Sequence, residues 1–181
     1  QNETSNADRF KERVMFPIHN YSGKVLGFGG RSLDPTNKAK YLNSPESAIY
    51  HKSKVLYGLY FSKSAIGRED NCYIVEGYTD VVSMHQAGIE NVVSASGTAL
   101  SSEQINLIGR LTKNITLLFD GDDAGLRASF KSIDLILKEG MNVKIVMFPE
   151  GEDPDSYSKK LSQEEYIKYL KENEKDFIQY K

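Results

Sequence analysis

The chain has 181 residues, of which 39% are hydrophobic and 27% are charged, and its net charge is −2. This composition is typical of a globular protein of one or two domains, and no apolar run is long enough to cross a membrane. One cysteine and three histidines exclude an internal disulfide and argue against a structural zinc site. Because the sequence begins with Gln1 rather than Met, we expect it to be a segment of a longer protein.

The charges are distributed unevenly along the chain. Residues 1–68 contain eleven Lys and Arg but five Asp and Glu, whereas residues 69–181 contain twelve Lys and Arg but twenty Asp and Glu. A basic part joined to an acidic part favours a protein that holds a polyanion on one and cations on the other. Two unrelated surface compositions would give the same counts, and charge alone does not decide between them.

The first part of the chain is predicted to form short strands and turns. Strand-like patterns at residues 14–18 and 25–31 flank turn residues at 20–24, which predicts a β-hairpin. Residues 34–54 show no clear periodicity, and residues 55–66 are predicted to form a short helix. We expect a small, mainly β, basic unit over residues 1–68.

From residue 71 onward, predicted strands and helices alternate. This pattern predicts a parallel sheet covered by helices, so the fold class is α/β, or α+β when the basic unit is included. We expect a Rossmann-like domain over residues 69–158 and the start of a C-terminal helical segment over 159–181. The predicted strands are residues 72–76, 91–96, 115–120 and 143–148, and the predicted helices are residues 79–87, 123–139 and two that begin at the capping residues Ser101 and Ser162.

Acidic residues follow three of the predicted strands. Because the carboxyl ends of parallel strands lie at one edge of a sheet, we expect their carboxylates to converge there. That much negative charge requires cations, and carboxylate oxygens suit Mg²⁺ or Mn²⁺. The sequence therefore predicts a metal site for phosphoryl or nucleotidyl transfer, with two or more ions, or one ion and a general acid or base. Its predicted ligands are Glu76, Asp80, Asp120, Asp122, Asp153 and Asp155.

Each acidic cluster has a simpler interpretation when it is considered alone. Glu76 and Asp80 could end a strand and begin a helix, Asp120 and Asp122 could form a turn, and residues 150–155 could be a solvated loop. The occurrence of all three clusters at strand ends of one α/β unit favours the metal site.

Two of these clusters resemble a known fold. Glu76-Gly77 after one strand and Asp120-Gly121-Asp122 after a later one resemble the Toprim fold of bacterial primases, topoisomerases, some nucleases and recombination mediators. The basic part resembles the bacterial DnaG-type primases, and the resemblance covers residues 9–160. It is carried by Arg13-Val14-Met15-Phe16-Pro17-Ile18, Gly27-Phe28-Gly29-Gly30-Arg31, Lys40-Tyr41-Leu42-Asn43-Ser44-Pro45-Glu46, His51-Lys52, Leu56-Tyr57-Gly58-Leu59, Glu76-Gly77-Tyr78 with Asp80, Phe119-Asp120-Gly121-Asp122 with Ala124-Gly125, and Asp153-Pro154-Asp155.

The resemblance implies an activity and a set of site residues. DnaG-type primases are DNA-directed RNA polymerases, nucleotidyltransferases that make short RNA primers on single-stranded DNA during replication. By resemblance, Glu76, Asp120 and Asp122 are catalytic, and Asp80, Asp153 and Asp155 surround the same Mg²⁺ or Mn²⁺ site, with two or more ions. Whether Glu76 is a ligand or a general base stays open. Template or nucleotide binding is implied for Arg31, Lys40, Asn43 and Lys52.

The resemblance also implies partners. They are a single-stranded DNA template, ribonucleoside triphosphates and the RNA primer, bound by a monomer in the bacterial cytoplasm with no role for a membrane. The family's zinc-binding domain, the first part of its polymerase core and its helicase-binding domain have no counterpart in this sequence, so we expect no zinc in this segment and helicase contact through a missing domain.

Other functions of the same fold stay open as alternatives. They are a topoisomerase, a nuclease, a phage-type primase joined to a helicase, and a non-catalytic Toprim scaffold that binds DNA or a partner. A topoisomerase would need a nucleophilic tyrosine in a separate domain, and a scaffold would be expected to have lost the acidic residues, which are present here.

Overall fold

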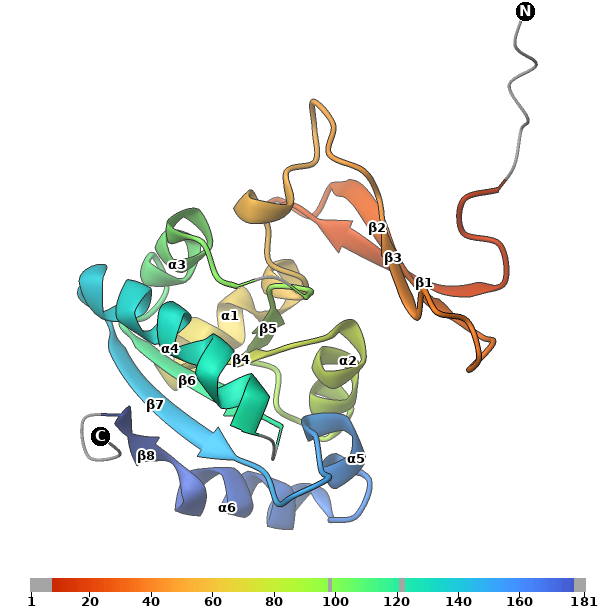
Figure 1. Cartoon of the computed structure of the whole chain (residues 1–181). Helices are drawn as coiled ribbons and strands as arrows, with labels where there is room; N and C mark the ends of the chain where they lie inside the picture. The colour runs from red at the N-terminus through yellow and green to blue at the C-terminus, as the bar shows by residue number, and fades with distance from the viewer. Residues whose placement is uncertain (1–7, 98, 121–122, 178–181) are drawn as a thin grey trace, which may run out of the picture.

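The computed structural model describes residues 8–97, 99–120 and 123–177 of the chain. They form two sheets, a smaller one that contains β1 to β3 and a larger one that is covered by helices (Figure 1). This is the mixed α/β fold, with a mainly parallel sheet, that the sequence predicts.

The smaller sheet is antiparallel and has the strand order β1-β2-β3. The predicted hairpin is confirmed, because β1 pairs with β2 through a turn in which the side chain of Asn20 accepts hydrogen bonds from the backbone of Ser22 and Lys24. β3 lies in a region for which no strand was predicted. The bounds are Arg13–His19 for β1, Val25–Ser32 for β2 and Tyr41–Asn43 for β3.

The larger sheet has the strand order β5-β4-β6-β7-β8. Its first four strands are parallel and match the four predicted strands, whereas β8 pairs antiparallel with β7 at the edge and was not predicted. The bounds are Cys72–Val75 for β4, Val92–Ser94 for β5, Asn114–Phe119 for β6, Asn142–Met147 for β7 and Lys175–Asp176 for β8.

Helices cover both faces of this sheet because the side chains of every strand alternate between the faces. Cys72 and Ile74 of β4 belong to one hydrophobic cluster, and Tyr73 and Val75 belong to the other. The first face carries α1 (Leu59–Glu69), α3 (Ser102–Gly109) and α4 (Asp123–Lys138), and the second carries α2 (Tyr78–Gln86), α5 (Pro154–Ser158) and α6 (Gln163–Asn173).

Two segments outside the predicted Rossmann-like unit pack onto its sheet. Leu59 and Ile66 of α1 are buried in the cluster on one face, and Tyr166 and Leu170 of α6 are buried in the cluster on the other. Residues 159–177 therefore complete the sheet layer and do not stand apart from it. The domain boundaries at residues 68 and 158 stay predictions. Among the described residues, no helix has the length and apolar character that a membrane span requires.

Candidate active site

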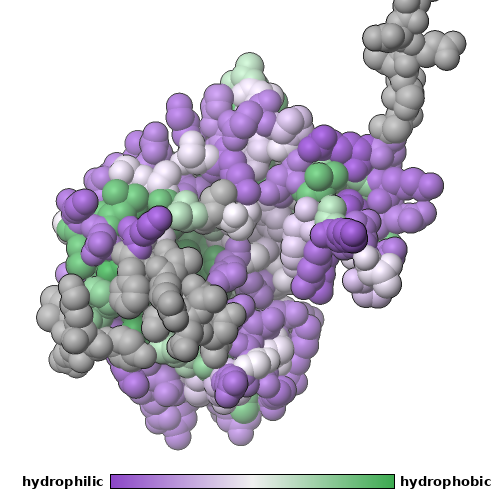
Figure 2. Space-filling view, viewed as in Figure 1, coloured by the Kyte–Doolittle hydropathy of each residue, from purple (hydrophilic) through white to green (hydrophobic). Residues whose placement is uncertain are grey.

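A cavity of about 280 Å³ lies where the smaller sheet faces the carboxyl edge of the larger one. Basic and amide side chains come from β2, β3 and the loop between them, and acidic side chains come from the segments that follow β4, β6 and β7, including the first turns of α2 and α5. Figure 2 shows that the surface around the smaller sheet is largely hydrophilic on this face of the molecule. The cavity is lined by Arg31, Lys40, Tyr41, Asn43, Glu76, Gly77, Tyr78, Thr79, Asp80, Ser96, Gly97, Asp120, Asp153 and Asp155.

Five of the six predicted metal ligands line this cavity. They are Glu76, Asp80, Asp120, Asp153 and Asp155, whereas Asp122 lies outside the described residues. Within the described ranges, no three Asp, Glu, His or Cys side chains are close enough together to form a metal-binding group. The carboxylates therefore surround a common space but do not form a closed cage, and their role as ligands stays a prediction.

Asp80 is the most deeply buried of these carboxylates, with 9% of the residue exposed. One of its oxygens accepts a hydrogen bond of 2.9 Å from the backbone of Gly77, which fixes the side chain at the start of α2. Burial raises the pKa of Asp80 to about 6, and the charges of Asp153, Asp155 and Glu76 add to this effect, although the Gly77 bond acts against it. The cavity thus has a negative potential that favours cations.

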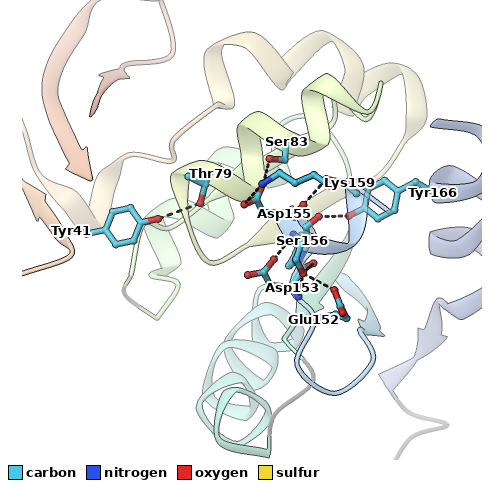
Figure 3. Close-up of polar contacts among 11 residues, drawn as sticks. Tyr41, Thr79, Ser83, Glu152, Asp153, Asp155, Ser156, Lys159 and Tyr166 are labelled. Atoms are coloured by element: carbon cyan, nitrogen blue, oxygen red, sulfur yellow. Dashed lines mark hydrogen bonds and ion pairs between the residues drawn. The ribbon is translucent and has the colours of Figure 1, made fainter. Parts of the chain in front are cut away.

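Asp155 is held by two partners, as Figure 3 shows. The hydroxyl of Ser83 donates to it from α2, and the ammonium of Lys159 lies 2.8 Å from its Oδ1 atom. Burial acts to raise the pKa of Asp155, but the hydrogen bonds from Lys159 and Ser83 outweigh it and hold that pKa below its usual value. Asp155 is therefore an ionised carboxylate that already has a cationic neighbour.

Asp153 has a structural role in the local fold. It is the N-cap of α5, and its side chain accepts a hydrogen bond of 2.6 Å from the backbone of Ser156. Pro154 occupies the first turn of this helix, where its missing N–H costs no hydrogen bond. The interpretation of residues 150–155 as a solvated loop is thus wrong from Asp153 onward, because Asp-Pro there begins a short helix.

The basic side of the cavity comes from the smaller sheet. The Arg31 guanidinium carbon and the Lys40 ammonium each lie 5.9 Å from the centre of the Tyr41 ring. The Tyr41 hydroxyl shares a hydrogen bond of 3.3 Å with Thr79, which belongs to the acidic side (Figure 3). Cationic groups from one sheet therefore face carboxylates from the other across the cavity.

Lys52 is not placed with the other predicted binding residues. It lies in the short helix η1 (Lys52–Lys54), and within the described residues it does not line the cavity. Its backbone N–H donates to Glu46 at 2.8 Å, and its carbonyl accepts from Gln104 at 3.1 Å. The position of Lys52 gives it a role in joining η1 to α3, and its predicted role in template or nucleotide binding receives no support from the cavity.

Sequence reasoning did not predict a role for Tyr78, Thr79 or Ser96, which also line the cavity. Thr79 and Tyr78 lie between Glu76 and Asp80 in the sequence, so their proximity to the predicted ligands could have been inferred. Ser96 follows β5 with a positive φ of 59°, a conformation that the sequence does not reveal.

Comparison with known proteins gives two family matches in the same order along the chain. Residues 1–63 match the DNA primase catalytic core, N-terminal domain, and residues 73–158 match the Toprim-like family. The DNA primase of Halalkalibacterium halodurans is 47% identical over 161 residues, which are 89% of this chain and 27% of that protein. The chain belongs to the DnaG-type primase family.

Solved primase structures share the fold over almost the whole chain. A DNA primase domain from Pseudomonas aeruginosa matches with a TM-score of 0.89 and 38% identity, over 99% of this chain and 57% of that one. A DnaG primase catalytic domain bound to single-stranded DNA matches with a TM-score of 0.83 and 40% identity, over 91% of this chain and 53% of that one. The chain thus spans little more than half of these primase domains, and about a quarter of the full-length relative.

Proposed function

We propose that this chain is the catalytic part of a primase that makes RNA primers on single-stranded DNA by metal-dependent nucleotidyl transfer. The main support is the cavity in which Arg31 and Lys40 face Glu76, Asp80 and Asp120. One side suits the phosphates of template and nucleotide, and the other suits divalent cations. The DnaG catalytic domain that was solved with single-stranded DNA has the same fold, which supports DNA as the template.

The donor chemistry of the acidic side fits Mg²⁺ or Mn²⁺. Mg²⁺ takes one or two protein carboxylates and completes its shell with water and phosphate oxygens, so it does not need a closed protein cage. Burial is the main cause of the raised pKa of Asp80, and the negative charges of its neighbours add to it, so a bound cation would stabilise the ionised carboxylate. Glu76, Asp80 and Asp120 are the residues that we assign to hold the ions, with Asp153 and Asp155 beside them.

In the proposed reaction, the 3′-hydroxyl of the growing primer attacks the α-phosphorus of a nucleotide and pyrophosphate leaves. Bound divalent ions supply activation of the hydroxyl and neutralisation of the charge that develops on the phosphates. Arg31 contacts phosphate through its planar guanidinium, and Lys40 acts as a point charge. Asn43 offers an amide for a polar contact, and Glu76 either holds an ion or accepts the proton of the hydroxyl.

The test is Asp120→Asn in the intact protein, because this change keeps the size of the side chain but removes one negative charge. We expect primer synthesis to fall by about 10³-fold or more, because several kcal/mol of transition-state stabilisation are lost with one ligand. The melting temperature in metal-free buffer should hold or rise, because one of several mutually repelling carboxylates is removed. Asp134→Asn is the matched control, because Asp134 is exposed on α4 and away from the cavity.

Two results would oppose this proposal. Primer synthesis near the unmutated rate would remove Asp120 from the catalytic residues. An unmutated protein that binds DNA but transfers no nucleotide with Mg²⁺ or Mn²⁺ would favour the non-catalytic scaffold. The bacterial cytoplasm as the place of action, and a helicase as a partner, belong to the same proposal.

A further inference from the structure

Tyr78 begins α2 but inserts its ring into the hydrophobic core of the smaller sheet. The other buried members of that cluster, Phe16, Ile18 and Tyr50, all come from the first part of the chain. The Tyr78 ring stacks on Phe16 with 5.1 Å between ring centres and meets Tyr57 edge-on at 4.7 Å. Only 2% of Tyr78 is exposed. A residue of the acidic half thus completes the core of the basic half.

Gly29 of β2 forms the slot that receives this ring. A Cβ on Gly29 would lie 2.4 Å from the Cε2 atom of Tyr78, well inside van der Waals contact. The ring therefore lies directly against the backbone of the smaller sheet, two residues from Arg31. Any side chain at position 29 would push the two sheets apart at this point.

The hydroxyl of Tyr78 adds a hydrogen bond between the two sheets. It donates a hydrogen bond of 2.7 Å to the Asn43 side chain on β3. The same tyrosine follows Glu76 by two residues, and the Glu76 carbonyl accepts a hydrogen bond of 2.6 Å from Ser94. The hydroxyl of Tyr78 is thus bonded to β3, and the backbone two residues before it is held to β5 by Ser94.

We propose that Tyr78 is a positioning residue that sets the distance between Arg31 and Lys40 on the smaller sheet and the carboxylates of Glu76 and Asp80 on the larger one. The reaction of a nucleotide needs both sides of the cavity at once, whereas binding a metal ion needs only the acidic side. A misplacement of about 1 Å between reacting groups costs on the order of 10²-fold in rate. Loss of the contact should therefore reduce nucleotide transfer much more than metal binding. The inference rests on the proposed function, because nucleotide transfer is the activity that is measured.

The experiment compares two changes that weaken the contact from opposite sides. Tyr78→Phe removes the hydroxyl, and Gly29→Ala displaces the ring. In the intact protein, we expect transfer to fall by about 10-fold for the first and about 100-fold for the second, mainly in kcat. Mn²⁺ affinity should stay within about 2-fold of the unmutated value in both, because the acidic loop is unchanged. The matched controls are Tyr57→Phe and Gly67→Ala, since a Cβ on Gly67 would meet open space.

Two further measurements separate positioning from a loss of folding. Spin labels on cysteines placed at the exposed residues Lys38 and Lys138 report the distance between the two sheets, and Cys72 is too buried to react. This distance distribution should broaden or shift in Tyr78→Phe and Gly29→Ala but not in the controls. In a double-mutant cycle, the losses caused by Tyr78→Phe and Asn43→Ala should add to less than their sum, because each change removes the hydrogen bond between these two residues.

Each outcome decides the inference. It is overturned if both variants keep transfer within about 2-fold, or if activity falls only in proportion to melting while the label distances stay unchanged. If the label distances change but the unmutated protein transfers no nucleotide, the positioning role of Tyr78 stands and the proposed function fails.

Discussion

The burial of Asp80 predicts how the stability of the metal-free protein depends on pH. The pKa of this carboxyl rises from 3.8 to about 6 in the folded chain, chiefly because it is buried. Between these two values the folded state holds a proton that the unfolded state has released. Ionising Asp80 in the fold is therefore unfavourable, and the stability that it contributes falls as pH rises through this window.

The size of the effect follows from the shift. One pKa unit corresponds to about 1.4 kcal/mol, so a shift of roughly two units costs about 3 kcal/mol once the pH exceeds the folded pKa. Asp80→Asn cannot ionise, and its amide oxygen can still accept the hydrogen bond from Gly77. The variant should match the unmutated protein near pH 4 and exceed it by about 2–3 kcal/mol near pH 7.

The assay is urea unfolding of both proteins in chelator across this pH range. Subtracting one curve of unfolding free energy against pH from the other removes the contributions of other carboxylates. One of these is Asp155, whose pKa is lowered, so the stability that it contributes rises with pH. Adding Mg²⁺ at pH 7 should narrow the difference, because a cation relieves the repulsion around Asp80. Parallel curves, with the same difference at every pH, would show that Asp80 is not the buried, proton-binding group described here.

Three further outcomes are expected. Single-stranded DNA affinity should fall steeply with salt, and Arg31→Ala and Lys40→Ala should each lower the slope of log affinity against log salt by about 0.7, measured by fluorescence anisotropy. Unchanged slopes in both would remove this surface from the DNA site. Lys159→Ala removes the ammonium partner of Asp155, so calorimetry should show Mn²⁺ affinity rising by up to about fivefold, the modest size expected of a partly exposed ion pair. Weaker binding would contradict that reasoning. Ser101→Ala should destabilise the fold by about 1 kcal/mol in urea, because Ser101 caps α3, and a neutral change would mean that the cap is not formed.

Local signals in the sequence predicted most of the larger sheet. The capping boxes at Ser101 and Ser162 mark the starts of α3 and α6 because the bonded groups are three residues apart. The four parallel strands were found because each is a buried apolar run between helices. Acidic residues that follow these strands line one cavity because the carboxyl ends of parallel strands lie at the same edge of the sheet.

The features that were missed depend on contacts between distant residues. β8 consists of Lys175 and Asp176, which carry no strand pattern and are extended only because β7 offers an open edge. The contact of the Lys52 carbonyl with Gln104 of α3 is also one that no local pattern indicates, and the binding role of Lys52 stays a prediction. The insertion of Tyr78 against Gly29 joins residues 49 positions apart, and no local pattern announces it.

The shared cluster around Tyr78 has a consequence for the order in which the protein folds. The larger sheet is built mainly from strand–helix units that follow one another along the chain, and such local topology favours rapid folding. The smaller sheet is made first during synthesis, but its core lacks the ring of Tyr78 until that residue has emerged and α2 has formed. The basic sheet therefore reaches its final packing late, on a surface supplied by the acidic one. Nascent chains that end before α2 lack this cover over Phe16 and Ile18, and exposed hydrophobic surface of this kind is where chaperones bind.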